Sequence, residues 1–195
     1  MTEQMSLLGE KPDIEIIESE VAMDEYLETC VDVPQFLEYC KQCTNYNHIW
    51  SCPPFSFDPV EYMKGYGRIL FVGYKIIIPE EKRQKTYTKK EQEVLMKELL
   101  SGPKKALDAD MLERERNHPG SKALSGGSCL SCDPGKCAKL EGKPCRYPEK
   151  MRYSVEALGG NVGLTVTKYL HQNLEWIEEG HLPGHFLLLG GLMLP

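Results

Sequence analysis

Eight cysteines constrain this chain more than any other feature, because they sort into two groups of four. Cysteines that only fill a core would be scattered along the sequence instead. The acidic N-terminus has no apolar signal segment, so we expect a cytoplasmic protein whose thiols stay reduced. The cysteines therefore predict thiolate metal sites, either two sites or one built from both groups. The early group is Cys30, Cys40, Cys43 and Cys52, and the late group is Cys129, Cys132, Cys137 and Cys145.

Length and charge exclude several classes of protein. With 195 residues, 41% of them hydrophobic, the chain can build one core, and we expect a flexible leader over residues 1–12 and a single metal-binding domain over residues 13–195. The 29 acidic residues outnumber the 23 basic ones, which argues against nucleic-acid binding. No apolar run approaches the roughly 20 residues of a membrane helix, so no membrane association is expected.

Hydrophobic patterning predicts an α+β domain with a small mixed sheet, flanked by helices and two cysteine-rich metal-binding loops. The segment 68–78 is apolar on both faces at its start, as in a central strand. Thr88 and Glu91 form a capping box, and Gly102-Pro103 is expected to interrupt the helix that follows. The predicted strands are 13–18, 68–78, 122–125 and 185–189, and the main predicted helices are 34–41, 58–66, 88–100, 103–116, 151–158 and 161–171.

The late group gives the strongest motif in the sequence. Its spacing is Cys-x2-Cys-x4-Cys-x7-Cys, which places four thiolates within 17 residues, from Cys129 to Cys145. A Cys-x2-Cys turn aims two sulfurs at one centre while backbone N–H groups point at those sulfurs. Such a set can enclose a 4Fe–4S cluster or, as the alternative, one tetrahedral zinc ion. Arg146 either adds positive charge near the cluster or forms a surface ion pair.

The early group supplies three thiolates within 13 residues, at Cys40, Cys43 and Cys52. Three ligands with an open fourth position are typical of chemically active metal sites. The fourth ligand is left open between Cys30, His48 and none, although Cys30 fits an ordinary buried thiol and His48 a polar loop residue. A single zinc shared by both Cys-x2-Cys pairs is a less favoured alternative.

Two motif blocks resemble a widespread bacterial and archaeal family of cysteine-rich predicted metal-binding proteins of unknown function. The first block is Cys40-Lys41-Gln42-Cys43 with Trp50-Ser51-Cys52-Pro53-Pro54. The second is Gly126-Gly127-Ser128-Cys129-Leu130-Ser131-Cys132 with Cys145-Arg146-Tyr147-Pro148-Glu149, Arg152, Ser154 and Glu156-Ala157. The resemblance covers about residues 13–192 and implies metal binding through these cysteines in a single α+β domain. The family has no established substrate.

The sequence thus predicts an iron–sulfur protein in electron transfer or a redox accessory role, with a redox protein as its partner. Two alternatives remain at this point: a zinc-binding structural or interaction module, and a metal-sensing or metal-handling protein. No catalytic machinery other than metal thiolates is identified. The predicted cluster ligands are Cys129, Cys132, Cys137 and Cys145, and the predicted ligands of a second site are Cys40, Cys43 and Cys52.

Overall fold

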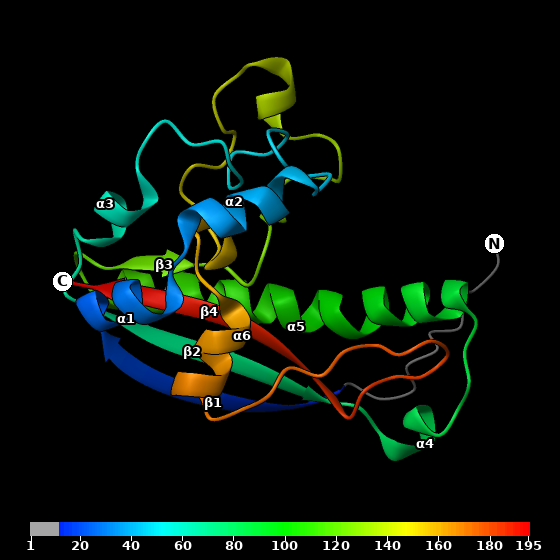
Figure 1. The fold of residues 1–195 in the computed structure, drawn as a ribbon. Coiled ribbons are helices and arrows are strands. Elements are labelled where there is room, and N and C mark those ends of the chain that lie inside the picture. The colour runs from blue at the N-terminus through cyan, green and yellow to red at the C-terminus, as the bar shows by residue number, and fades with distance from the viewer. Residues whose placement is uncertain (1–11) are drawn as a thin grey trace.

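A four-stranded sheet with the order β1-β2-β4-β3 lies at the centre of the computed structural model, which describes residues 12–195 (Figure 1). The α+β class and the single domain are confirmed, whereas the predicted leader lies outside the described residues apart from Pro12. The strands are β1 (Asp13–Ala22), β2 (Arg68–Ile77), β3 (Lys122–Leu124) and β4 (His185–Leu194). The helices are α1 (Met23–Cys30), α2 (Val33–Lys41), α3 (Pro59–Met63), α4 (Glu80–Arg83), α5 (Lys89–Asn117) and α6 (Val162–Tyr169), with short 3₁₀ helices η1 (Ala138–Glu141) and η2 (Glu156–Leu158).

Every strand pair in the sheet is antiparallel, in place of the mixed sheet expected from the sequence. The reason lies in the connections. Ala22 at the end of β1 pairs with Arg68 at the start of β2, and Ile77 at the end of β2 pairs with His185 at the start of β4. The connection from β1 to β2 therefore leaves and re-enters the sheet at the same end, and β4 enters the sheet at the end where β2 leaves it, so both pairs are antiparallel.

Strand β2 is buried on both faces, as its sequence predicts, because it lies between β1 and β4 with helices on either side. Ile69 and Phe71 pack with side chains of α1, η2 and α6 on one face of the sheet. Val72 and Tyr74 pack against α5 on the other face. The alternation of these side chains follows from the two-residue period of a strand.

Helix α5 is continuous over 29 residues, so the predicted break at Gly102-Pro103 is wrong. Proline removes one backbone donor, but Leu99, Pro103 and Leu107 are all buried on the side of the helix that faces the sheet. Burial of this apolar stripe offsets the lost hydrogen bond. The capping box of Thr88 and Glu91 at the start of the helix is confirmed. Among the helices of residues 12–195, none combines the length and apolarity needed to cross a bilayer.

The predicted helix over residues 151–158 is mostly absent, since only η2 is helical there. Ser125 explains the difference, because its N–H donates to the carbonyl of Tyr153 over 2.8 Å and it forms a parallel bridge with Ser154. The backbone before η2 therefore bonds to the segment after β3 instead of to itself.

Both cysteine loops lie on the same side of the molecule, around α2 (Figure 1). The connection from β1 to β2 starts and ends at one end of the sheet, and it carries α2 and the early cysteine loop, residues 40–52. At 1.5 Å per residue, α5 spans roughly 43 Å and returns the chain from the opposite end. Strand β3 and the late cysteine loop, residues 129–145, follow it.

Candidate metal centre

Helix α2 and the turn after it place the first two cysteines of the early cysteine loop. Asp32 caps the helix by accepting from the N–H of Gln35 over 3.0 Å, so the helix starts at a defined position and ends with Cys40 in its last turn. The N–H of Cys43 donates to the carbonyl of Cys40 over 3.0 Å, which closes the turn between the two cysteines. The loop then returns through Cys52 to a cis peptide bond between Pro53 and Pro54.

The sulfurs of Cys40, Cys43 and Cys52 lie close enough to act on one another electrostatically. Burial raises the pKa of Cys52 to about 11, with further contributions from Cys43 and Cys40 in the same direction. Burial likewise raises the pKa of Cys40, and the charges of Cys43 and Glu156 add to the shift. Crowded, partly buried thiols resist ionisation until a cation neutralises them, which is the behaviour of a metal site.

Neither Cys30 nor His48 joins this group. Cys30 is 2% exposed and belongs to the core beneath α1, where its sulfur accepts a hydrogen bond from the hydroxyl of Thr29 over 3.6 Å. His48 is exposed, and its Nδ1 lies 2.7 Å from the carbonyl oxygen of Thr44. The structure therefore places Cys30 in the core and His48 on the loop surface.

All four late cysteines line one cavity of about 510 Å³, together with residues of the early cysteine loop and of α5. Burial raises the pKa of Cys145, and the sulfurs of Cys129, Cys137 and Cys132 shift it further in the same direction. The late sulfurs thus act on one another, just as the early ones do. This grouping favours two sites over a single site shared between the two Cys-x2-Cys pairs.

Backbone N–H groups approach cysteine sulfurs in both loops, as the Cys-x2-Cys turns predict. The N–H of Asn45 donates to Cys43 and that of Ser131 donates to Cys129, each over 3.5 Å. The N–H of Tyr147 forms the same type of bond with Cys145 and thereby opposes the rise in its pKa. In all three cases the donor lies two residues after the cysteine. Such bonds favour the thiolate form that binds metal.

The two loops contact each other directly. The indole N–H of Trp50 donates to the carbonyl of Lys143 over 3.0 Å, and the N–H of Cys129 donates to the hydroxyl of Ser51 over 3.2 Å. Ser51 is 1% exposed, so this contact is internal to the protein. The ammonium of Lys139 donates to the carbonyls of Ile49 and Cys52 over 3.3 and 3.1 Å. The two candidate metal sites are therefore neighbours.

Lys139 lies between the two groups of sulfurs. Its ammonium is 5.4 Å from the centre of the Trp50 ring. Burial lowers the pKa of Lys139, while the charges of Cys52 and Cys137 oppose that shift. One cation therefore acts on a cysteine of each loop. Arg146 contributes a second cation: it forms the expected ion pair with Glu141 over 2.7 Å and also hydrogen-bonds to Cys132.

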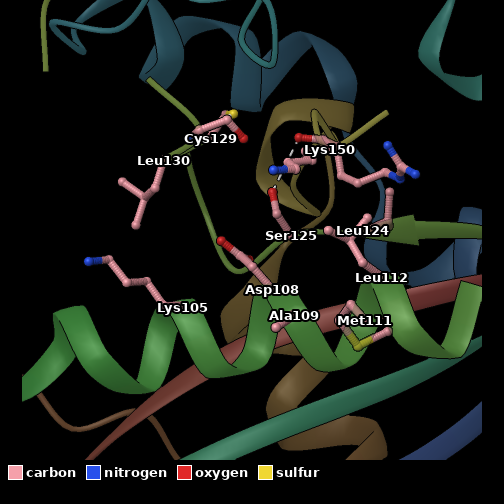
Figure 2. A pocket seen from close by; sticks show the side chains of 12 residues that line it. Lys105, Asp108, Ala109, Met111, Leu112, Leu124, Ser125, Cys129, Leu130 and Lys150 are labelled. Atoms are coloured by element: carbon pink, nitrogen blue, oxygen red, sulfur yellow. Dashed lines mark hydrogen bonds between the residues drawn. The ribbon is translucent and has the colours of Figure 1, made fainter. Parts of the chain in front are cut away.

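A second cavity of about 210 Å³ separates the start of the late cysteine loop from α5 (Figure 2). Figure 2 shows Cys129 and Leu130 on the loop above the helix, with Lys105 and Asp108 reaching up from α5. Asp108 accepts from the N–H of Gly126 over 3.1 Å, which anchors the loop to the helix. A Cβ atom on Gly126 would lie 2.8 Å from a methyl group of Leu107, so a larger residue here would displace that side chain.

Beyond the last cysteine, Arg152 fixes the chain to α5. Its guanidinium donates to both carboxylate oxygens of Glu115 over 2.6 Å, and Arg152 is 8% exposed. Glu115 also accepts from the N–H of Ala123 in β3 over 2.7 Å. Burial tends to raise the pKa of Glu115, but the hydrogen bonds from Arg152 and Ala123 outweigh it and lower the pKa overall. This pair connects α5, β3 and the end of the late cysteine loop.

The donors surround cavities without converging on one point. Within residues 12–195, no three His, Cys, Asp or Glu side chains lie close enough together to enclose a single metal ion. A tetrahedral zinc site brings its sulfurs to within roughly 3.8 Å of one another, since each lies about 2.3 Å from the metal. The chemistry of the donor set, thiols with N–H groups directed at them, nevertheless fits a metal group.

Comparison with known protein families matches residues 28–194 to a family described as predicted metal-binding protein (DUF2284). The chain belongs to this family. The match includes both cysteine loops and confirms the resemblance inferred from the two motif blocks. No curated protein and no solved structure matches the chain. Membership in the predicted metal-binding family supports a metal site and leaves the metal and the activity to be inferred from the geometry.

Two residues of the site are not indicated by the spacing of the cysteines. Lys139 lies in a stretch that separates two cysteines and carries no motif of its own. Glu156 belongs to the second motif block, but nothing in the sequence indicates that it approaches Cys40. Only the contacts between the loops and between η2 and α2 reveal these two positions.

Proposed function

We propose that this protein is an iron–sulfur protein that acts in electron transfer or in a redox accessory role. Cys129, Cys132, Cys137 and Cys145 would hold a 4Fe–4S cluster, and Cys40, Cys43 and Cys52 would hold a second metal centre. When bound, the cluster supplies one-electron redox chemistry, and the chain supplies the thiolates, hydrogen bonds and charges that set its potential.

One observation carries the proposal: four mutually interacting thiols surround a shared cavity of about 510 Å³. In a 4Fe–4S cluster each thiolate binds a different iron atom, so the sulfurs stand around a volume instead of meeting at one ion. A single zinc ion would instead draw the four sulfurs together around one point, so a cavity of this size suits the larger group better.

The surroundings of the thiols support a redox role. N–H groups directed at Cys129 and Cys145, and the guanidinium of Arg146 at Cys132, favour a cluster that carries negative charge. The early cysteine loop lies directly beside the late one, so electrons would have a short path between the two centres. All eight cysteines are free thiols, which a reducing cytoplasm would maintain.

Anaerobic purification followed by iron, sulfide and zinc analysis tests the proposal. The wild-type protein is expected to be brown, to absorb near ~400 nm and to contain iron and sulfide, whereas a Cys129→Ser/Cys132→Ser variant loses most of both. Cys30→Ser is the matched control, because it removes a cysteine outside both loops. A colourless wild-type protein with stoichiometric zinc and no sulfide, purified from iron-replete cells, would contradict the cluster and favour the zinc module.

A further inference from the structure

A buried carboxyl group lies beside the early cysteines. The Oε2 atom of Glu156 is out of contact with solvent and has no hydrogen-bond partner. Buried carboxyl oxygens are normally hydrogen-bonded or paired with a cation, so an unpartnered one calls for an explanation. Glu156 also acts electrostatically on Cys40.

Glu156 and Cys40 line the same cavity of about 200 Å³. The rest of its wall is almost entirely apolar and comes from α2, from Pro53 and Pro54 after Cys52, and from two phenylalanines, Phe55 and Phe57. The hydroxyl of Ser154 and the backbone N–H of Glu156 hydrogen-bond to the carboxyl, so Oε2 alone is left without a partner. Of the early cysteines Cys40 lines this cavity, and the proline pair in its wall follows Cys52 directly in the chain.

The backbone holds Glu156 in this position. The segment after η2 contacts the start of α2 so closely that a Cβ atom on Gly159 would lie 2.6 Å from a methyl group of Val33. The N–H of Asp32 also donates to the carbonyl of Gly159 over 2.9 Å. Because η2 is fixed against the helix that carries Cys40, the carboxyl cannot move far from the early thiols.

We propose that Glu156 is the fourth protein ligand of the early metal centre, beside Cys40, Cys43 and Cys52. Carboxylate oxygen and thiolate sulfur both bind zinc and iron in proteins, and a bound cation would supply the partner that Oε2 lacks. The two sequence-based candidates are positioned differently, since Cys30 lies in the core and His48 bonds to Thr44. This inference rests on the proposed second metal centre and adds its missing ligand.

Cobalt binding to the reduced, metal-free full-length chain tests the assignment. The early-centre signal is defined as the part of the Co²⁺ absorption that a Cys40→Ser/Cys52→Ser variant loses. Glu156→Gln is expected to lower the Co²⁺ affinity measured from the early-centre signal by about tenfold or more and to shift the d–d bands of that signal. Co²⁺ binding by the late cysteines should stay unchanged.

Glu98→Gln is the matched control. Glu98 has the second buried carboxyl oxygen without a hydrogen-bond partner among residues 12–195, but it lies on α5 and lines neither cysteine cavity. It undergoes the same chemical change and should bind Co²⁺ as wild type does. Equal affinities at the early centre in wild type, Glu156→Gln and Glu98→Gln would overturn the proposal.

Thermal melting of the metal-free protein tests whether the Glu156 carboxyl has a structural role instead. Because one carboxyl oxygen of Glu156 has no hydrogen-bond partner, Glu156→Gln should leave the melting temperature close to that of wild type. A large drop without metal would assign the carboxyl a structural role and overturn its assignment as a ligand. If wild type bound no Co²⁺ at the early cysteines, the second centre itself would be wrong, independently of the iron and sulfide content of the late cysteine loop.

Discussion

The ammonium of Lys139, in the late cysteine loop, donates to the backbone carbonyl of Cys52, in the early one, over 3.1 Å. The same ammonium acts on Cys137, so one positive charge stands between the two groups of thiols. The charge of Lys139 acts on any metal group that either loop holds. The partial burial of the lysine strengthens this electrostatic effect.

Lys139→Met should make the reduction potential of the proposed cluster more negative, by about 40 mV, because the reduced cluster loses a nearby cation. Lys136→Met removes an exposed lysine of the same loop that pairs with Asp133 over 3.3 Å, and it should shift the potential far less. Anaerobic redox titration measures both. Equal shifts in the two variants would show that Lys139 has no special position.

Arg152→Met should lower the free energy of unfolding by about 3 kcal/mol, because it leaves the carboxylate of Glu115 without its bidentate partner. Arg146→Met breaks a solvent-exposed ion pair with Glu141 and should cost at most about 1 kcal/mol. Chemical denaturation of both variants without metal gives the comparison. Similar losses in the two would contradict the structural role assigned to Arg152.

The pair of Arg152 and Glu115 also predicts a pH dependence. The folded state lowers the pKa of Glu115, so the unfolded chain takes up the proton first as the pH falls. The stability from this pair is complete above the ordinary glutamate pKa of about 4.3 and is lost as the pH drops through the lower folded value. The stability difference between wild type and Arg152→Met should therefore shrink between about pH 5 and pH 3. A constant difference over that range would contradict the ion pair.

Gly159→Ala should destabilise the protein by about 3 kcal/mol, because the new methyl group meets Val33 and the backbone has a φ of 92°. Gly142 has a φ of 65°, but a Cβ added there would meet no neighbour within 4 Å, so Gly142→Ala isolates the backbone strain and should cost about 1 kcal/mol. Thermal or chemical unfolding separates the two. If the costs were equal, the close contact between η2 and α2 would not be required.

Cys30→Ala should leave the metal content unchanged and lower the stability by about 1 kcal/mol, since it removes a sulfur from the packed core. Cys52→Ser should do the reverse, reducing metal binding at the early cysteines with little effect on the stability of the metal-free protein. Metal analysis and unfolding of the two variants distinguish these patterns. Loss of metal in Cys30→Ala would restore that cysteine as a candidate ligand.

Local features of the fold were predictable where neighbouring residues determine them. The cap at Thr88, the strand 68–77 and the turns that aim N–H groups at sulfurs follow from short-range chemistry. The break expected at Pro103 is wrong because helix propensity says nothing of the long apolar face that α5 buries on the sheet. The helix predicted at 151–158 is wrong because Ser125, far away in the sequence, takes its backbone carbonyls.

For the candidate site, the division of cysteines into two groups was predictable, whereas their adjacency was not. Spacing indicates which sulfurs share a loop, but only the tertiary fold brings the two loops into contact. The contacts of Lys139, Ser51 and Glu156 are all between segments distant in sequence, and no pattern within either loop encodes them.

The position of β4 has a consequence for how the protein is made. This strand lies between β2 and β3, yet it is synthesised after every cysteine in the chain. During translation, both cysteine loops therefore leave the ribosome before the strand that joins the two parts of the sheet. The thiols are exposed to the cell, and to whatever delivers metal, before the framework that positions them is complete. The thiols are therefore made before the strand that closes the sheet around them.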